Sequence, residues 1–256
     1  MHTKTDGAAL FRLDGLTALI TGASRGIGEG CARMLAALGA HVVLVARDAA
    51  ELERLAGGIR ESGGSAEYWA LDLTRRAEFE ARVAALPALD ILVNNLGMNI
   101  PQPFMGVDEA SFDRVMDLNV KTNFFCAQTG ARRMRDTGGG GAIIMITSQA
   151  GHVALPERTV YCASKFAMEG MSKAMALELA PDGIRVNTVA PTFVRTPMTE
   201  PFLRDPAFAA YVEASIPMGR MASVEEVAAA VAYLAAPASR IVTGTSLLVD
   251  GGWTMK

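Results

Sequence analysis

The feature that most constrains the fold of this chain is the repeated alternation of short apolar runs with longer helical patterns. Several runs are nearly continuous in Val, Ile and Leu, which is typical of strands buried on both faces of a parallel sheet. Helical periodicity fills the intervals, for example at 28–39 and 224–236. Strand, helix and strand in this order predict βαβ units. The runs occupy residues 16–21, 41–46, 66–71, 89–94, 142–147, 184–189 and 246–249.

These units predict an α/β fold, a doubly wound Rossmann fold with a seven-stranded, mainly parallel sheet flanked by helices. A chain of 256 residues is long enough to bury a sizeable core. No long linker or internal repeat interrupts it, so we expect residues 1–256 to form a single Rossmann-type domain. Pro-containing irregular sequence at about 192–218 predicts one large insertion, which would form a substrate loop.

Composition and charge exclude several classes of function. The net charge is −3 and no Lys/Arg run occurs, which argues against a nucleic-acid partner. Neither a signal-peptide core nor an apolar run of about 18 residues is present, so we expect no membrane partner. Widely spaced cysteines without a CxxC motif argue against disulfides or zinc and suit a cytoplasmic protein. We expect no metal site, because the histidines are scattered; these residues are Cys31, Cys126, Cys162, His2, His41 and His152.

A glycine-rich segment, TGASRGIG at residues 21–28, follows the first apolar run and opens a helical pattern. Gly22, Gly26 and Gly28 lack Cβ atoms, which lets the chain turn tightly and lets a pyrophosphate approach the backbone. The free N–H groups of the following helix would then point at the pyrophosphate. The segment therefore predicts a dinucleotide-binding loop.

The end of the second apolar run bears on which ribose the loop would accept. An NAD site typically places an acidic residue there to bind the ribose 2′-hydroxyl. Here the run ends in VARD, with Ala46 at the expected position and Arg47 after it. Arg47 and Arg25 can hold a 2′-phosphate through paired hydrogen bonds, which favours NADP(H) and leaves NAD(H) possible. In the competing interpretation Arg47 is a solvated loop residue, and Asp48 caps the next helix or reaches a ribose hydroxyl.

Tyr161 and Lys165 stand four residues apart in the segment VYCASKFAMEG. Side chains at this spacing share one face of a helix. One interpretation is a solvated helix with a surface lysine. The other is a catalytic acid whose pKa the lysine lowers.

Six motifs now identify a family that the chain resembles over nearly its whole length, the classical short-chain dehydrogenases/reductases. In family order they are TGASRGIG, NNLG (94–97), LNV with Asn119, ITSQAG with Ser148, YCASK with Tyr161 and Lys165, and VAPTFVRTPM (189–198). Ser148 precedes Tyr161 by 13 residues, the usual separation in this family. Two residues depart from the family pattern without removing a catalytic group, namely Leu96 for alanine and Thr192 for glycine.

The resemblance implies an NAD(P)-dependent enzyme that acts on CH–OH groups (EC 1.1.1.-) and uses Asn119, Ser148, Tyr161 and Lys165 for catalysis. Tyr161 would exchange the proton, Ser148 would bind the substrate oxygen, and Asn119 would hold a water that links Lys165 to solvent. A free tyrosine has a pKa near 10. A cation about 4 Å away contributes on the order of 4 kcal/mol at an effective dielectric of about 20. Lys165 is therefore expected to lower the pKa of Tyr161 by up to roughly three units, before burial acts in the opposite direction.

The resemblance also implies which residues contact the cofactor. Lys165 would bind the nicotinamide ribose, Asp72 would lie by the adenine, and Thr196 would hold the carboxamide. The C-terminal strand would pack against a partner subunit, so we expect a homo-oligomer, a tetramer or a dimer. The full expected set is Gly22, Ser24, Arg25, Gly26, Ile27, Gly28, Arg47, Asp72, Leu73, Asn94, Gly97, Tyr161, Lys165, Pro191, Val194 and Thr196.

The substrate side contains several polar candidates near the expected ends of the strands. They favour a small-molecule substrate that is polar and hydroxylated, such as a sugar, a polyol or a sugar acid. The segment 198–208 is rich in Phe and Leu, so a hydrophobic ketone or a 3-oxoacyl thioester stays an alternative. The candidate substrate residues are Asn99, Ser148, Gln149, His152, Arg158 and Phe193.

Two other classes of protein compete with this hypothesis. An epimerase or dehydratase of the extended form of the fold usually has a longer C-terminal substrate domain than this chain has. A non-catalytic dinucleotide sensor would be expected to lack Ser148, Tyr161 or Lys165, and all of them are present.

Overall fold

The structure is a computed structural model that describes residues 7–255. Its centre is one seven-stranded sheet in the order β3-β2-β1-β4-β5-β6-β7. Every neighbouring pair is parallel, so the predicted doubly wound sheet is confirmed, and it is wholly rather than mainly parallel. The strands are β1 (Thr17–Thr21), β2 (His41–Ala46), β3 (Ser65–Ala70), β4 (Ile91–Asn94), β5 (Gly141–Ile146), β6 (Ile184–Pro191) and β7 (Ser246–Val249).

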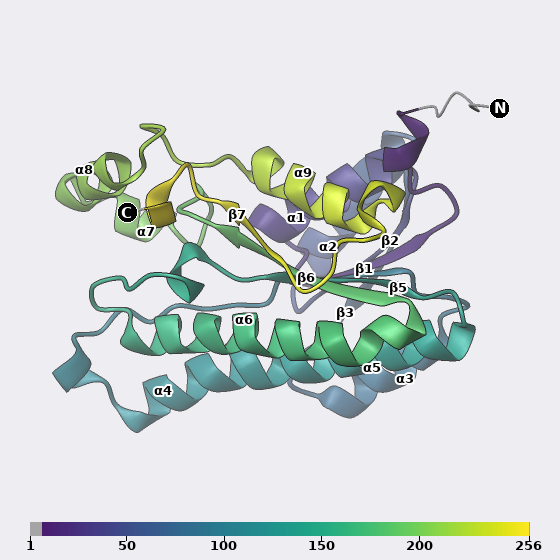
Figure 1. The fold of residues 1–256 in the computed structure, drawn as a ribbon, viewed down its shortest axis with the longest axis horizontal. Helices are drawn as coiled ribbons and strands as arrows, with labels where there is room; N and C mark the ends of the chain where they lie inside the picture. The colour runs from purple at the N-terminus through teal and green to yellow at the C-terminus, as the bar shows by residue number, and fades with distance from the viewer. Residues whose placement is uncertain (1–6, 256) are drawn as a thin grey trace.

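Helices cover both faces of the sheet, so the molecule has three layers (Figure 1). This double cover explains why the central strands are apolar on both sides, with β4 buried at every position. One face carries α1 (Gly26–Ala37), α2 (Ala49–Glu61) and α9 (Val224–Ala235). The other carries α3 (Arg76–Ala85), α5 (Asn123–Thr137) and α6 (Thr159–Leu179), with α4 (Glu109–Met116) beside α6.

Local sequence determines where the flanking helices begin and which face they bury. α9 begins with a capping box, in which the Ser223 hydroxyl accepts from Glu226 N and the Glu226 carboxylate accepts from Ser223 N. Its buried residues include Val227, Val231 and Leu234, which recur at helical spacing. This stripe packs on the same apolar cluster as α1 and thereby fixes the helix that follows the glycine loop.

The sheet order reverses at β1, which pairs with β2 on one side and β4 on the other. Ligands of doubly wound folds bind at this point, beyond the carboxyl ends of the strands. The segments after β1 and β4 are joined there, since Asn95 Nδ2 donates to Gly22 O at 3.0 Å. The glycine-rich loop therefore lies where the topology places a ligand.

The segment after β6 carries α7 (Glu200–Leu203) and α8 (Pro206–Ser215). Leu203, Val212 and Ile216 form a separate apolar cluster with Trp253 near the C-terminus. Figure 1 shows both helices and the chain end together at one end of the molecule. In the part of the chain that the structure describes, no helix has the length and apolarity needed to cross a membrane.

Candidate active site

The glycine loop between β1 and α1 is shaped for close approach to its backbone. Gly22 and Gly26 have positive φ values of 63° and 59°. At Gly28 a Cβ atom would lie 2.2 Å from Gly22 O, so only glycine fits. Arg25 occupies the N-cap position of α1 without a side-chain cap, and the first N–H groups of a helix have no intrahelical acceptor. The loop therefore fits a pyrophosphate, whose oxygens would accept these hydrogen bonds.

Asn95 is a residue of this site that sequence reasoning missed. Its Nδ2 donates to Gly22 O at 3.0 Å and to Thr21 O at 3.3 Å, and its backbone N–H donates to Thr21 Oγ1. These bonds hold the glycine loop against the end of β4. Asn94, which was expected to line the cofactor, is fully buried and donates to Asn123 O and Met145 Sδ instead. The Asn94 amide nitrogen therefore bonds groups of the protein interior, and a contact of Asn94 with the cofactor stays a prediction.

The end of β2 presents arginine rather than carboxylate. Ala46 is the last residue of β2, and Arg47 follows it as an exposed residue. Asp48 caps α2 by accepting from Glu51 N at 3.2 Å, as in the competing interpretation. The pKa of Asp72 is lowered mainly by hydrogen bonds from Thr74, and to a lesser degree by the positive charge of Arg47.

The other expected cofactor residues lie around the glycine loop and the end of β6. Thr196 abuts the loop, since a Cβ on Gly26 would lie 3.3 Å from Thr196 Cγ2. The backbone N–H of Thr196 donates to Thr199 Oγ1 at 3.0 Å, which makes Thr199 a further residue that holds this segment. Pro191 ends β6, and Val194 and Leu73 are buried.

α6 brings Tyr161 and Lys165 together on one face. Lys165 Nζ lies 5.6 Å from the centroid of the Tyr161 ring. Lys165 is only 3% exposed, and its Nζ donates to Ile146 O at the end of β5 at 3.1 Å. The surface-lysine interpretation is therefore wrong, because Lys165 is buried. The hydrogen bond to Ile146 O offsets part of the cost of burying its ammonium group.

Asn119 reaches the same place from a π-helical segment, Asp117–Thr122, which interrupts the helix between α4 and α5. Its Oδ1 accepts from Met98 N at 2.8 Å, and its Nδ2 donates to Met98 O and to Ser164 Oγ. Asn119 Oδ1 and Lys165 Nζ border one spot beside Gly97, since a Cβ there would lie 3.8 Å and 3.5 Å from them.

Burial dominates the ionisation of the Tyr161–Lys165 pair. It raises the pKa of Tyr161 above its usual value of 10, although a hydrogen bond with Ser148 and the charge of Arg158 act in the opposite direction. Burial also lowers the pKa of Lys165 to about 8, and Glu169 partly offsets this effect. The expected lowering of the Tyr161 pKa by Lys165 is therefore wrong for the protein alone, since desolvation of the phenolate outweighs the nearby charges.

Ser148 and Tyr161 line one cleft, which is partly open to solvent and has a cavity volume of about 70 Å³. Within residues 7–255 the side-chain oxygens of Asn99 and Thr192 and both polar atoms of Gln149 are buried without a hydrogen-bond partner. Buried polar atoms are rarely left unpaired in folded proteins, so these groups are available to a ligand. The lining residues are Asn99, Ser148, Gln149, Leu155, Arg158, Tyr161, Thr192, Phe193, Met198, Thr199 and Phe202.

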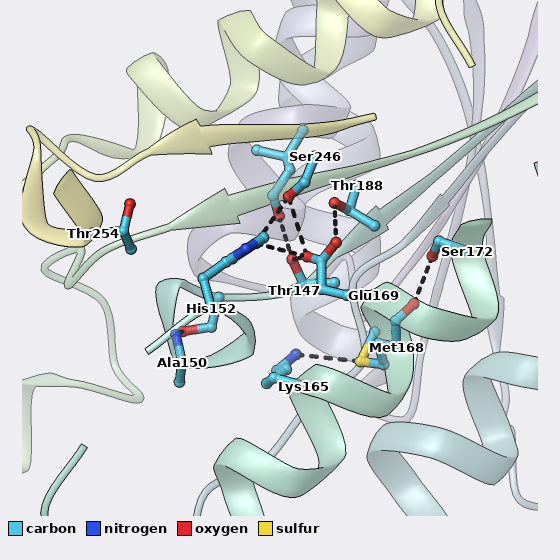
Figure 2. Close-up of polar contacts among 12 residues, drawn as sticks. Thr147, Ala150, His152, Lys165, Met168, Glu169, Ser172, Thr188, Ser246 and Thr254 are labelled. Atoms are coloured by element: carbon cyan, nitrogen blue, oxygen red, sulfur yellow. Dashed lines mark hydrogen bonds and ion pairs between the residues drawn. The ribbon is translucent and has the colours of Figure 1, made fainter. Parts of the chain in front are cut away.

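His152, the remaining expected substrate residue, is absent from that lining and takes part in a separate polar cluster (Figure 2). Its Nε2 lies 3.0 Å from Ser246 Oγ and 3.3 Å from Glu169 Oε1. Glu169 also accepts from Thr147 Oγ1 at 2.6 Å and from Thr188 Oγ1 at 2.9 Å. This buried carboxylate joins α6 to β7, to β6 and to the segment directly after β5. Only its position one turn after Lys165 could have pointed to it in the sequence.

Comparison with known proteins agrees with this geometry. A family model described as enoyl-(acyl carrier protein) reductase matches residues 22–254. The chain is 41% identical to D-erythrulose reductase of Gallus gallus, covering 93% of this chain and 96% of the relative. It is 38% identical to D-threitol dehydrogenase of Mycolicibacterium smegmatis, covering 96% of this chain and 95% of the relative. The crystal structure of a gluconate 5-dehydrogenase from Burkholderia cenocepacia, in complex with NADP and tartrate, has a TM-score of 0.93 at 36% identity, covering 97% of this chain and 99% of that one.

Proposed function

Because the chain belongs to the short-chain dehydrogenase/reductase family, we propose that it interconverts a secondary alcohol and a ketone with NADP(H) as cofactor. The observation that carries this proposal is the arrangement of Ser148, Tyr161 and Lys165. Ser148 and Tyr161 line one cleft, and the Lys165 ammonium lies 5.6 Å from the Tyr161 ring.

In the proposed reaction each residue has a defined task. Tyr161 gives a proton to the ketone oxygen in reduction and takes it back in oxidation. Ser148 donates a hydrogen bond to the same oxygen and keeps it beside the phenol. Lys165 holds the positive charge near the phenolate and binds ribose hydroxyls, and Asn119 borders the spot where a water can connect Lys165 to solvent. The nicotinamide, when bound, supplies or accepts the hydride.

The cofactor fits the loop and the strand ends described above. The uncapped first turn of α1 would hold the pyrophosphate, and Arg25 and Arg47 would hold the 2′-phosphate of NADP(H). A gluconate 5-dehydrogenase with the same fold binds NADP, which supports this preference. NAD(H) remains the alternative. The other proposed contacts are Gly22, Ser24, Gly26, Ile27, Gly28, Asp72, Leu73, Gly97, Pro191, Val194 and Thr196.

The proposed substrate is polar and hydroxylated, a sugar, a polyol or a sugar acid. The unpaired polar atoms of Asn99, Gln149 and Thr192 support it, because a hydroxylated chain offers each of them a partner. Relatives named for erythrulose, threitol and gluconate support the same class. A 3-oxoacyl thioester is the second candidate, favoured by the apolar side chains of Leu155, Phe193 and Phe202 in the cleft. The matching family model is described by an enoyl thioester, so it supports an acyl thioester only as a general class.

The state of assembly and the compartment are also proposals. We propose a homo-oligomer, a dimer or tetramer, because Leu177 on α6 and Ile241 before β7 are 80% and 96% exposed apolar residues. A cytoplasmic location agrees with the free cysteines of residues 7–255. The chain is proposed to be one domain in which residues 192–218 form the substrate loop.

A screen with both cofactors tests the proposed function. Purified protein is assayed for oxidation of NADPH or NADH with neutral ketoses, sugar keto acids and a 3-oxoacyl thioester. Turnover of sugar-like ketones with NADPH is the expected result. Turnover of the thioester alone would favour the second candidate, and binding of NADPH without turnover of any ketone would indicate a sensor.

A further inference from the structure

The cleft beside Ser148 and Tyr161 contains one charged side chain, Arg158, and no carboxylate among its lining residues. Arg158 precedes α6 and is 6% exposed. Its Nη1 donates to Pro156 O at 3.1 Å. Within residues 7–255 its Nε and Nη2 donate no hydrogen bond, and no carboxylate oxygen lies within 4.0 Å of the guanidinium.

Aromatic rings of the proposed substrate loop fix this guanidinium in place. Its Cζ lies 5.4 Å from the centroid of Phe202 and 5.5 Å from that of Phe208, so it contacts α7 and α8 by cation–π interactions. The rings stabilise the charge but accept no conventional hydrogen bonds. The forked donor therefore stays available at the wall of the cleft.

A largely buried guanidinium without a carboxylate partner needs an explanation, because burial of charge is costly without a counter-charge. Burial lowers the pKa of Arg158, and the negative charge of its neighbour Glu157 partly offsets this, although an arginine keeps its proton at neutral pH. A neutral hydroxyl would accept one hydrogen bond from the guanidinium. A carboxylate would accept two parallel ones and also balance the charge.

From this arrangement, and resting on the proposed function, we infer that the substrate carries a carboxylate that Arg158 binds, so that it is a sugar acid rather than a neutral sugar or polyol. The reacting carbon lies by Ser148 and Tyr161. The neutral groups of Asn99, Gln149 and Thr192 bind hydroxyls along the chain between the two ends.

The test compares keto acids with neutral ketoses of the same carbon number and ketone position, using the full chain and NADPH. A charge-assisted hydrogen bond corresponds to about ten- to a hundredfold in binding, so kcat/KM should favour the keto acid by at least about tenfold. In Arg158→Gln this ratio should fall toward one, mainly through KM for the keto acid. Arg158→Lys, which keeps the charge without the fork, should fall in between. The matched control Arg204→Gln removes an exposed charge from the end of α7 and should leave the ratio unchanged.

A second measurement needs no variant of Arg158. Tartrate and its neutral diamide are compared as inhibitors of ketose reduction by the unmodified protein, and tartrate should bind at least about tenfold more tightly. Equal inhibition, or none by either compound, overturns the inference, and so does an unchanged ratio in Arg158→Gln. Reduction of neutral ketoses without any preference for keto acids would overturn this inference alone. Failure of both substrate classes would overturn the proposed function as well.

Discussion

The hydroxyl of Thr147 donates to Glu169 Oε1 across 2.6 Å, and this bond joins α6 to the end of β5 (Figure 2). Thr147 lies between Ile146, whose carbonyl accepts from Lys165, and Ser148, which lines the cleft. One carboxylate thus holds the segment that carries Ser148 against the helix that carries Lys165. The proposed chemistry needs Ser148, on the segment after β5, to stay close to Tyr161 and Lys165 on α6. Neither element fixes that distance by itself.

Replacing Glu169 by glutamine should therefore destabilise the fold. Glu169 accepts from three hydroxyls, and glutamine replaces these charge-assisted hydrogen bonds with weaker neutral ones in a buried site. We expect the free energy of unfolding to fall by about 1–3 kcal/mol at pH 7, measured by urea unfolding. Glu178→Gln, at an exposed position on the same helix, is the control. A change within about 0.5 kcal/mol, as is usual for surface substitutions, would contradict the prediction.

The depressed pKa of Lys165 predicts how stability depends on pH. Burial lowers this pKa to about 8 in the protein without cofactor, whereas the unfolded chain keeps the proton to about pH 10.4. Between these values the unfolded state binds more protons, so the contribution of Lys165 to the free energy of unfolding rises with pH, by about 3 kcal/mol in total. Below pH 8 both states are protonated, and the cost of burying the charged ammonium lowers the free energy of unfolding in full.

Lys165→Met lacks this titration and provides the measurement. The free energy of unfolding of the unmodified protein should rise relative to that of Lys165→Met between pH 8 and pH 10. Lys173→Met, at an exposed position on α6, is the matched control and should show no such trend. A pH-independent difference for Lys165→Met would show that Lys165 does not titrate in this range. The same variant should lose turnover and bind NADPH more weakly.

Tyr161→Phe removes the proposed proton donor and keeps the ring. We expect kcat to fall by about two to four orders of magnitude, the usual contribution of general acid–base catalysis. Cofactor affinity, measured by NADPH fluorescence, should be largely retained, in contrast to Lys165→Met. Activity within tenfold of the unmodified protein would remove Tyr161 from the role of acid and base.

The sequence predicts the sheet well because buried parallel strands are continuous apolar runs, so each of the seven strands lies within two residues of its run. It predicts side-chain direction less well. Adjacent residues of a strand point to opposite sides, so the exact register at the end of β4 determines whether Asn94 or Asn95 faces the glycine loop. The π-helical segment around Asn119 also depends on a distant contact, that of its amide with Met98.

Ionisation was the least predictable property of the site. The spacing of Tyr161 and Lys165 predicted that they share a face, but the burial that reverses the expected pKa shift of Tyr161 comes from the surrounding layers. His152 was a candidate for the cleft because it is a polar residue near the expected end of a strand. It contacts Glu169 and Ser246 instead, and β7 is remote from His152 in sequence.

The choice of cofactor depends on the residues that follow β2. Asp48 is engaged as the cap of α2, and Ala46 offers no carboxylate to a ribose. A charge-assisted hydrogen bond contributes about 1.5–3 kcal/mol, and 1.4 kcal/mol is a factor of ten. Arg47→Ala should therefore lower the ratio of kcat/KM for NADP to that for NAD by about ten- to a hundredfold. Ala46→Asp should lower it further, because the new carboxylate repels a 2′-phosphate and accepts from ribose hydroxyls.

The control is Arg135→Ala, which removes an exposed arginine from the last turn of α5 and should leave the ratio of kcat/KM for NADP to that for NAD unchanged. A parent protein that prefers NAD, or an Arg47→Ala variant with an unchanged ratio, would show that Arg47 does not bind the phosphate.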